Sequence, residues 1–332
     1  MMKHTRNLGR LRRASLALGV VALALAAGAP GEAAELAKVN FARLSFPSHV
    51  GMATDILKEQ GFDRKHGLDI ELKNFGAVGA FYAAQATGEA DAGIGGPLVY
   101  QKMRLEGAPL RIISTLVDMT SMVVIAKDPA IRSLTDLKGK TLAAAVAASE
   151  YQVLTVVAKS KGIIMGKDVT VVPADPPMAR TQLAAGRVDA VMTWEPAATL
   201  TMRDNPNYRV IFNAKQGWRE ITGKDGWLLV LAAHEGFLRR SPELIPRLVA
   251  AFRDVALFMK SNPDDADRII SKSINLPPGA FKEMVTTPRV VFEVRPTTEP
   301  AARESIWEVI KVAVAEGFYK DPPKDQSVIY TP

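Results

Sequence analysis

The chain has 332 residues, 48% of them hydrophobic and 23% charged, a composition that excludes a disordered protein and allows one or two sizeable cores. Its 42 Lys and Arg against 35 Asp and Glu give a formal charge of +7, but the basic residues are scattered singly, which argues against a nucleic-acid-binding surface. The absence of cysteine excludes disulfides, thiolate metal sites and cysteine nucleophiles.

The first 33 residues have the organisation of a secretory signal peptide. Five basic residues precede or flank the start of an apolar run from Ala14 to about Ala29, and small residues follow at Ala33 and Ala34. We expect cleavage near Ala33 or Ala34 and release into the periplasm, by Sec export or, as the alternative, by the twin-arginine route. Cleavage after Ala33 would leave 37 basic against 34 acidic residues, because it removes five Lys or Arg and one Glu.

The first half of the mature chain alternates strands and helices. In chain order we expect a strand at 38–41, a loop at 42–49, a helix at 50–60, a strand at 69–75, a glycine-containing turn at 76–79, a helix at 80–87, a strand at 90–94 and a helix that begins at Pro97. This alternation favours a parallel sheet flanked by helices.

The same pattern recurs about one hundred residues later. The segment Ala-Thr-Gly-Glu-Ala-Asp-Ala at 86–92 aligns with Ala-Ala-Gly-Arg-Val-Asp-Ala at 184–190. In both copies a Gly ends a helix, Asp-Ala opens a short strand, and a proline, Pro97 or Pro196, starts the next helix. Two similar α/β lobes are the simplest explanation.

We therefore predict two lobes joined by a two-strand hinge. Lobe I comprises 34–125 plus 228–332, and lobe II comprises 126–227. The β-rich runs at 121–125 and 226–231 lie where the chain would cross between the lobes, and they are the expected hinge. The remaining chain predicts four helices with proline at or near each start, which should pack back on lobe I. Their expected ranges are 242–260, 263–273, 278–284 and 300–316.

A ligand site is expected where the strands end. In open α/β sheets ligands bind beyond the carboxyl ends of the strands, and helix N-termini that converge there offer free N–H groups to an anionic or strongly polar group. These rules select as ligand-binding residues Ser45, Phe46, Ser48, His49, Gly76, Ala77, Gly96, Pro97, Ser149, Tyr151, Trp194 and Glu195.

Several of these residues have a structural alternative. Ser149 with Gln152 fits a capping box and is then a plain helix cap. Gly96 serves either a tight turn or the close approach of backbone to a ligand. Trp194 either stacks on a ligand or packs in the core. Glu195 either locks the hinge, lies in solvent, or pairs with a ligand.

The sequence carries no sign of catalysis. Ser48 and His49 are adjacent, so their side chains point apart instead of forming a nucleophile–base pair. No histidine spacing suggests a metal site, and Leu98 and Leu134 stand where the dinucleotide and phosphate-loop motifs need glycine. We therefore expect neither catalytic residues, nor a metal, nor a cofactor.

Five segments resemble the periplasmic substrate-binding proteins of ABC importers for nitrate, sulfonates and taurine, a group related to binders of thiamine-pyrimidine precursors. They lie at 61–72, 88–91, 136–140, 185–190 and 194–196. The resemblance implies a type II periplasmic-binding fold in which each lobe is a mostly parallel sheet flanked by helices. It also implies that the lobes close on a ligand about the hinge.

The resemblance further implies a receptor that is not an enzyme. It would bind a sulfonate-, nitrate- or taurine-like ligand, or an aromatic or heterocyclic solute, and deliver it to an ABC permease with a cytoplasmic ATPase. We expect a monomer that contacts the membrane only through the permease and binds no nucleic acid. The alternative is a secreted enzyme on the same fold; the related pyrimidine synthase depends on cysteines, which are absent here.

Overall fold

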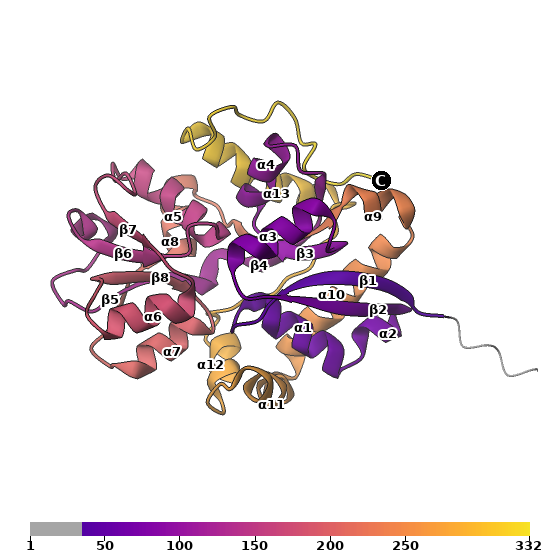
Figure 1. The fold of residues 1–332 in the computed structure, drawn as a ribbon, viewed down its shortest axis with the longest axis horizontal. Coiled ribbons are helices and arrows are strands. Elements are labelled where there is room, and N and C mark those ends of the chain that lie inside the picture. The colour runs from indigo at the N-terminus through magenta and orange to yellow at the C-terminus, as the bar shows by residue number, and fades with distance from the viewer. Residues whose placement is uncertain (1–34) are drawn as a thin grey trace, which may run out of the picture. The chain divides into compact units, whose positions relative to one another are not determined.

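Two five-stranded sheets, each flanked by helices, lie side by side in the protein (Figure 1). The structure, a computed structural model, describes residues 35–332, so the predicted signal peptide lies outside the described residues. Each sheet with the helices packed on it is called a lobe below, the first lobe containing the chain's first strand. The predicted two-lobed α/β fold is confirmed.

The first sheet is mostly parallel. Its strands lie in the order β2 (Leu68–Phe75), β1 (Ala37–Leu44), β3 (Ala92–Gly95), β10 (Trp227–His234) and β4 (Leu110–Asp118). β1 pairs in parallel with β2 and β3, whereas β10 is antiparallel to both of its neighbours. The seven residues of β10 from Trp227 to Ala233 are all buried, as expected for an apolar strand in the middle of a covered sheet.

The second sheet repeats this arrangement. Its strands lie in the order β7 (Thr170–Pro173), β6 (Thr141–Ala144), β8 (Ala190–Trp194), β5 (Met122–Ala126) and β9 (Arg209–Asn213). β6 is parallel to β7 and β8, and β5 is antiparallel to β8 and β9. In each sheet the fourth strand therefore runs against the others, and it is the strand that the chain enters after crossing from the other lobe.

The helices belong to one sheet or the other. Those of the first lobe are α1 (His49–Glu59), α2 (Phe62–Lys65), α3 (Val78–Thr87), α4 (Pro97–Leu105), α9 (Glu235–Arg240), α10 (Leu244–Ser261), α11 (Pro263–Ile274), α12 (Ala280–Thr286) and α13 (Pro300–Ala315). Those of the second lobe are the 3₁₀ turn η2 (Leu134–Leu137), α5 (Ser149–Ser160), α6 (Pro176–Ala184), α7 (Ala197–Asp204) and α8 (Ala214–Thr222). A second 3₁₀ turn, η1 (Met119–Ser121), connects the sheets. Across residues 35–332, every helix is too short or too polar to span a bilayer.

The four C-terminal helices pack on the first lobe, as predicted. α10 contacts α1, α2 and strands β2 and β4, α11 contacts α1, and α13 contacts α4 and strands β4 and β10. Phe252 of α10 stacks on Phe41 of β1 with ring centroids 5.1 Å apart, and both rings are fully buried. The tail thus packs mainly on the first lobe.

The internal repeat is confirmed in atomic detail. Gly88 and Gly186, which follow α3 and α6, both have a left-handed backbone with φ of 80° and 69°. Asp91 accepts a hydrogen bond from the backbone N–H of Asn40 at 2.9 Å, and Asp189 accepts one from that of Thr141 at 2.8 Å. In both lobes the repeated aspartate therefore binds the backbone of the neighbouring parallel strand, within β1 in the first lobe and at the start of β6 in the second.

The chain crosses between the sheets at 118–122 and again at 223–227. The predicted β-rich runs are strands: β5 begins at Met122 in the second sheet, and β10 begins at Trp227 in the first. The division of the chain into lobes at 125/126 and 227/228 remains a prediction. Strand β5 follows the first crossing and belongs to the second sheet.

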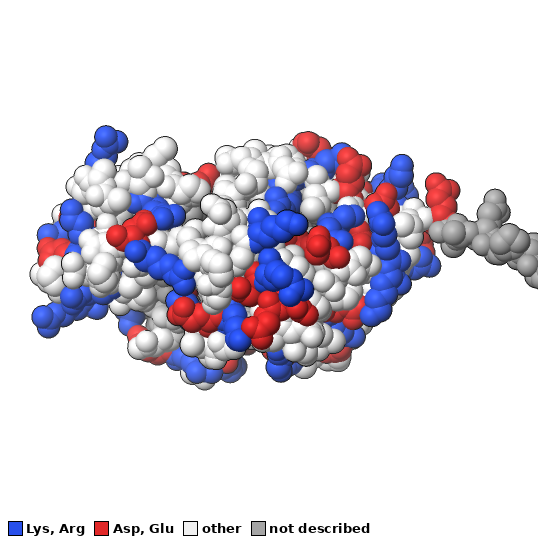
Figure 2. Space-filling model, turned by 90° about the horizontal axis from the view of Figure 1, so that it is seen from below, with Lys and Arg blue, Asp and Glu red and all other residues white. Residues whose placement is uncertain are grey.

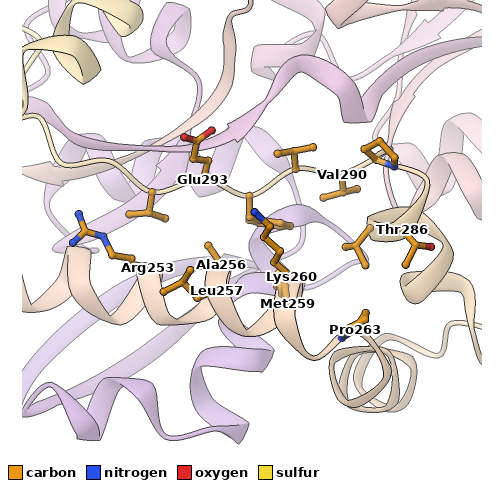
Figure 3. A pocket seen from close by; sticks show the side chains of 14 residues that line it. Arg253, Ala256, Leu257, Met259, Lys260, Pro263, Thr286, Val290 and Glu293 are labelled. Atoms are coloured by element: carbon orange, nitrogen blue, oxygen red, sulfur yellow. The ribbon is translucent and has the colours of Figure 1, made fainter.

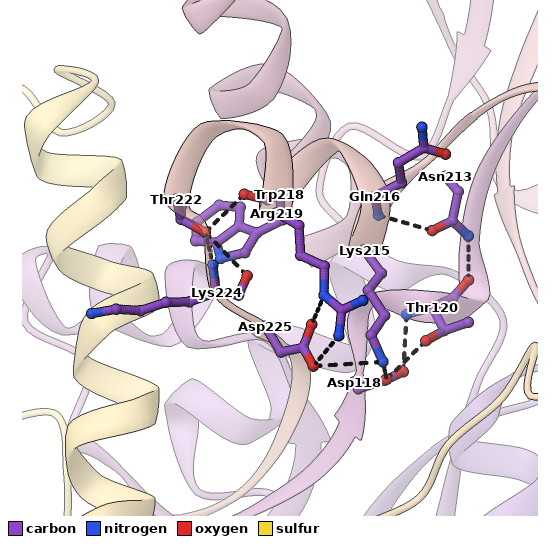
Figure 4. A network of polar contacts seen from close by, with 10 residues as sticks. All are labelled: Asp118, Thr120, Asn213, Lys215, Gln216, Trp218, Arg219, Thr222, Lys224 and Asp225. Atoms are coloured by element: carbon purple, nitrogen blue, oxygen red, sulfur yellow. Dashed lines mark hydrogen bonds and ion pairs between the residues drawn. The ribbon is translucent and has the colours of Figure 1, made fainter.

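A polar network ties both crossings to α8 (Figure 4). The ammonium of Lys215 lies 2.7 Å from the carboxylate of Asp118 and 3.8 Å from that of Asp225. Asn213 donates to the carbonyl of Thr120 at 2.7 Å. One lysine of the second lobe thus contacts the end of β4 and the segment that leads into β10.

Charges of both signs are interspersed on the face seen in Figure 2. On this face the positive charges do not form the continuous cluster that a binder of polyanions needs.

Candidate functional site

A small cavity lies where the two lobes meet. Its volume is about 30 Å³, far below the roughly 300–1,000 Å³ of ligand pockets, because the lobes touch around it. The first lobe supplies Leu44, Ser48, His49, Val50, Val78, Phe81, Tyr82, Ile94 and Leu229, and the second lobe supplies Ala148, Glu150 and Trp194. The carboxyl ends of β1, β3 and β8 all lead to it, as the strand-end rule predicts.

The two lobes touch through Tyr82 and Ser149. The Tyr82 hydroxyl lies 2.8 Å from the Ser149 hydroxyl, and it accepts a longer hydrogen bond, 3.4 Å, from the backbone N–H of Gly96. A Cβ atom on Gly96 would lie only 2.1 Å from the Ser149 hydroxyl oxygen. Gly96 thus permits a close approach, here by a side chain of the other lobe.

The capping-box interpretation of Ser149 is wrong. The N-cap of α5 is Ala148, and Ser149 makes no capping hydrogen bond to the helix. Its hydroxyl is directed across the interface to Tyr82 instead, and Ser149 is 1% exposed. The Ser149 hydroxyl thus contacts the other lobe and does not cap α5.

His49 is buried with an unpaired nitrogen. It begins α1, whose N-cap Ser48 accepts a hydrogen bond from the backbone N–H of Gly51 at 3.1 Å. Nε2 of His49 has no hydrogen-bond partner, although the residue is only 1% exposed. Burial lowers the pKa of His49 to about 3, so the imidazole is neutral at physiological pH.

Glu150 is the acidic group of the cavity. It is 4% exposed, and burial raises its pKa to about 7. It lies close enough to Tyr82 that its charge helps to raise the pKa of the phenol, after the larger effect of burial. Near neutral pH, Glu150 is therefore poised between a charged and an uncharged form.

Trp194 ends β8 and lines the cavity while remaining 2% exposed. Its backbone pairs with that of Met122 at the start of β5, which fixes the indole at the junction of the lobes. This position is compatible with both stacking on a ligand and packing in the core, because the ring is buried and also borders the cavity. Ligand contact by Trp194 stays a prediction.

Glu195 points away from the cavity lining. Its carboxylate accepts a hydrogen bond from the backbone N–H of Thr199 at 3.0 Å and lies 3.5 Å from a guanidinium nitrogen of Arg289. Burial raises the pKa of Glu195, and Arg289 opposes that rise. Arg289 follows α12 of the first lobe, so the pair joins the lobes and favours the hinge-locking interpretation.

The other predicted residues lie around the site without lining it. Ser45, Gly76 and Ala77 are exposed at the ends of β1 and β2, and Ser45 donates to the carbonyl of Phe75 at 3.1 Å. Pro97 is buried in the first turn of α4. Phe46 and Tyr151 are half-buried against the core. Their contact with a ligand stays a prediction.

The sequence analysis missed Phe81, Tyr82 and Glu150. The two aromatic residues lie inside α3, where no strand-end rule selects them, and their rings meet edge to face with centroids 5.2 Å apart. Glu150 is next in sequence to the selected Ser149, and this adjacency was the available signal. Within residues 35–332, we find no grouping of His, Asp or Glu suited to holding a metal ion.

A larger hollow of about 510 Å³ lies on the first lobe, separate from the small cavity (Figure 3). It runs between α10 and the segment 285–294, with Arg253 and Glu293 near one end and Val290 near the other. None of the predicted ligand-binding residues lines it. The small cavity, which both lobes build, is therefore the candidate site.

Comparisons with known proteins agree with the fold. The alkanesulfonate-binding protein SsuA of Xanthomonas axonopodis pv. citri, solved with MOPS, superposes with a TM-score of 0.74 at 17% identity, covering 90% of this chain and 99% of that one. The aliphatic sulphonate-binding protein SsuA of Escherichia coli gives 0.68 at 16% identity, covering 88% and 97%. The fold is thus that of the periplasmic binding proteins.

The sequence comparisons give the family. A Brucella abortus (strain 2308) protein named as a binding protein is 24% identical over 223 residues, 67% of each chain. Residues 47–266 match the family described as NMT1/THI5 like, which is well over half of the chain. The protein belongs to the NMT1/THI5-like family, in agreement with the resemblance seen in its sequence.

Proposed function

We propose that the protein is a solute receptor of the periplasm. It captures one small organic or anionic solute between its lobes and delivers it to an ABC import permease driven by a cytoplasmic ATPase. It acts as a monomer, meets the membrane only through the permease and leaves the solute chemically unchanged. The alkanesulfonate-binding names of the structural relatives support this class of function.

The observation that carries the proposal is the cavity to which both lobes contribute. Three aromatic residues, Phe81, Tyr82 and Trp194, line it and offer flat faces to a bound molecule. The lobes are joined by two short crossings, an arrangement that allows closure about a hinge. A receptor needs both features, since the solute must enter between the lobes and then be enclosed.

The groups around the cavity also fit binding better than catalysis. Ser48 caps α1 through its hydroxyl, and no hydrogen bond joins it to His49 among the described residues. The Ser149 hydroxyl is engaged by Tyr82. Neither serine is therefore paired with a base that would activate it as a nucleophile.

A thermal-shift screen of the purified protein tests the proposal. The panel contains sulfonates, nitrate, taurine, pyrimidine precursors and aromatic or heterocyclic solutes, and a receptor should gain stability saturably from one class. Mass spectrometry of the bound solute should then recover it unchanged with one molecule per chain. Conversion of the solute into a product would instead establish the secreted-enzyme alternative.

A further inference from the structure

The cavity between the lobes is lined by one acidic side chain and by one unpartnered imidazole nitrogen, and by no cationic side chain. No Lys or Arg is among the residues that line it. The Glu150 carboxylate receives a hydrogen bond from its own backbone amide, and no cationic side chain in residues 35–332 lowers its pKa. Glu150 therefore has acceptor capacity to spare on a side chain that is only 4% exposed.

His49 adds a second unsatisfied group. A buried polar atom without a partner is uncommon in proteins and calls for an explanation. Nε2 of His49 is such an atom, and its residue lines the same cavity as Glu150. Because the imidazole is neutral, it brings no positive charge that could attract an anion.

Three of the backbone donors near the junction are engaged by the protein itself. The Gly96 N–H donates to the Tyr82 hydroxyl, and that of Thr199 donates to Glu195. The Val78 N–H, in the first turn of α3, meets the carboxylate of Asp175 from the other lobe. These three N–H groups thus donate to oxygen atoms of the chain and not to a solute.

Where Glu150 is ionised, at a pH above about 7, an anionic solute would meet a carboxylate here. Two like charges in a water-poor site repel strongly, whereas an N–H or O–H donor on a solute would satisfy a carboxylate that now lacks an outside partner. From these contacts we infer that the receptor's solute is an uncharged or cationic molecule whose N–H or O–H groups donate to Glu150, with His49 Nε2 as a second contact. The inference rests on the proposed function and narrows it, since it sets this site apart from a sulfonate site.

Matched probes on one scaffold test the inference. Benzamide, nicotinamide and benzamidine carry donors and are uncharged or cationic, whereas benzenesulfonate and pyridine-3-sulfonate are anions of similar size. Isothermal titration calorimetry on the purified full-length protein should detect saturable binding within the first group alone. In the variant Glu150→Gln that binding should weaken by at least about tenfold, the loss expected for one hydrogen bond to a charged group.

The controls separate this inference from the proposed function. Glu89→Gln, which alters an exposed acid of the first lobe, should leave the affinity unchanged. Saturable binding of an anion that Glu150→Gln leaves intact or tightens would overturn the inference but keep the receptor. Failure of every donor-bearing probe to bind would overturn it as well. Chemical conversion of a bound probe would instead overturn the proposed receptor function.

Discussion

Glu150 should make the free energy of unfolding fall as pH rises, whereas acids whose pKa is lowered in the folded state have the opposite effect. Its pKa is about 7 in the folded protein against 4.5 for an ordinary Glu, so the folded state holds a proton that the unfolded state loses as pH rises between these values. Folding stability should therefore fall across that window and stay reduced above it. A shift of this size corresponds to a penalty on the order of 3 kcal/mol.

Glu150→Gln removes this titration. We expect the variant to be more stable than the natural protein at about pH 8 and to lose most of that gain near pH 5, as measured by urea unfolding. His49 and Tyr82, the other titratable side chains that line the cavity, are present in both proteins, so the comparison isolates Glu150. The same gain at both pH values would contradict the assignment.

Trp194 tests the aromatic part of the site. Trp194→Ala should weaken binding of the best solute from the screen by about 1–3 kcal/mol if the indole stacks on it. The side chain is buried, so this variant also loses stability, and Trp194→Phe provides a folded comparison with a smaller ring. Calorimetry on both variants, with circular dichroism as the folding control, decides between stacking and core packing. Unchanged affinity in folded Trp194→Ala would leave the residue a core role only.

Part of the site could be predicted from single residues and part could not. Ser48, His49 and Trp194 follow or end strands and line the small cavity, and the strand-end rule selects them because parallel strands bring their ends to one edge. Tyr82 escapes this rule, since the direction of a side chain in mid-helix depends on how the whole helix packs. Glu150 escapes it because an acid in the first turn of a helix is usually exposed, and the opposite lobe is what buries it.

At the scale of elements, the start of α4 shows how closely the lobes fit. A methyl group on Gly96 would meet Ser149 at 2.1 Å and the Leu228 carbonyl oxygen at 2.9 Å, and the second contact is with backbone that cannot move aside. Gly96→Ala should therefore cost about 1–3 kcal/mol in urea unfolding and push the lobes apart, as seen by a larger radius of gyration in X-ray scattering.

Gly79 is the matched control for this substitution. It lies in the first turns of α3, and a methyl group there would meet nothing within 4 Å. Gly79→Ala should stabilise the protein by about 0.5–1 kcal/mol, because alanine favours a helix over glycine. If Gly96→Ala behaved in the same way, the contact between α4 and Ser149 would not limit the approach of the lobes.

Element boundaries were predictable where a local signal marks them. Prolines begin α4, α11 and α13 as expected, and glycine follows α3. The strand β1 runs to Leu44, beyond its predicted end, because its last residues pair with β2 up to Phe75. That extension depends on a partner strand, which a local pattern does not contain.

At the scale of the molecule, the two lobes share one topology and differ in what the chain adds to them. Both sheets have three parallel strands followed by one antiparallel strand, and in both the antiparallel strand is the one that receives a crossing. The internal repeat predicts this likeness. The tail from α10 to α13 then packs mainly on the first lobe, so the second lobe is the smaller of the two.

Lys215 forms ion pairs with both segments that connect the lobes. Its ammonium contacts Asp118, whose side chain is 11% exposed, and also Asp225, so it holds both connecting segments to α8. Lys215→Met leaves Asp118 largely buried without its cation. We expect a loss of roughly 1–2 kcal/mol in unfolding free energy, between the values for exposed and buried ion pairs.

The variant should also loosen the connection between the lobes. Amide hydrogen exchange should accelerate at 118–122 and 223–227 while the central strands β1 and β8 keep their protection, because only the local opening energy changes. Lys224→Met is the matched control: it lies on the same crossing, but its pair with Glu308 is exposed, so its effect should stay within about 0.5 kcal/mol. Equal exchange at the crossings in both variants would show that sheet pairing alone, and not Lys215, fixes how the two lobes are joined.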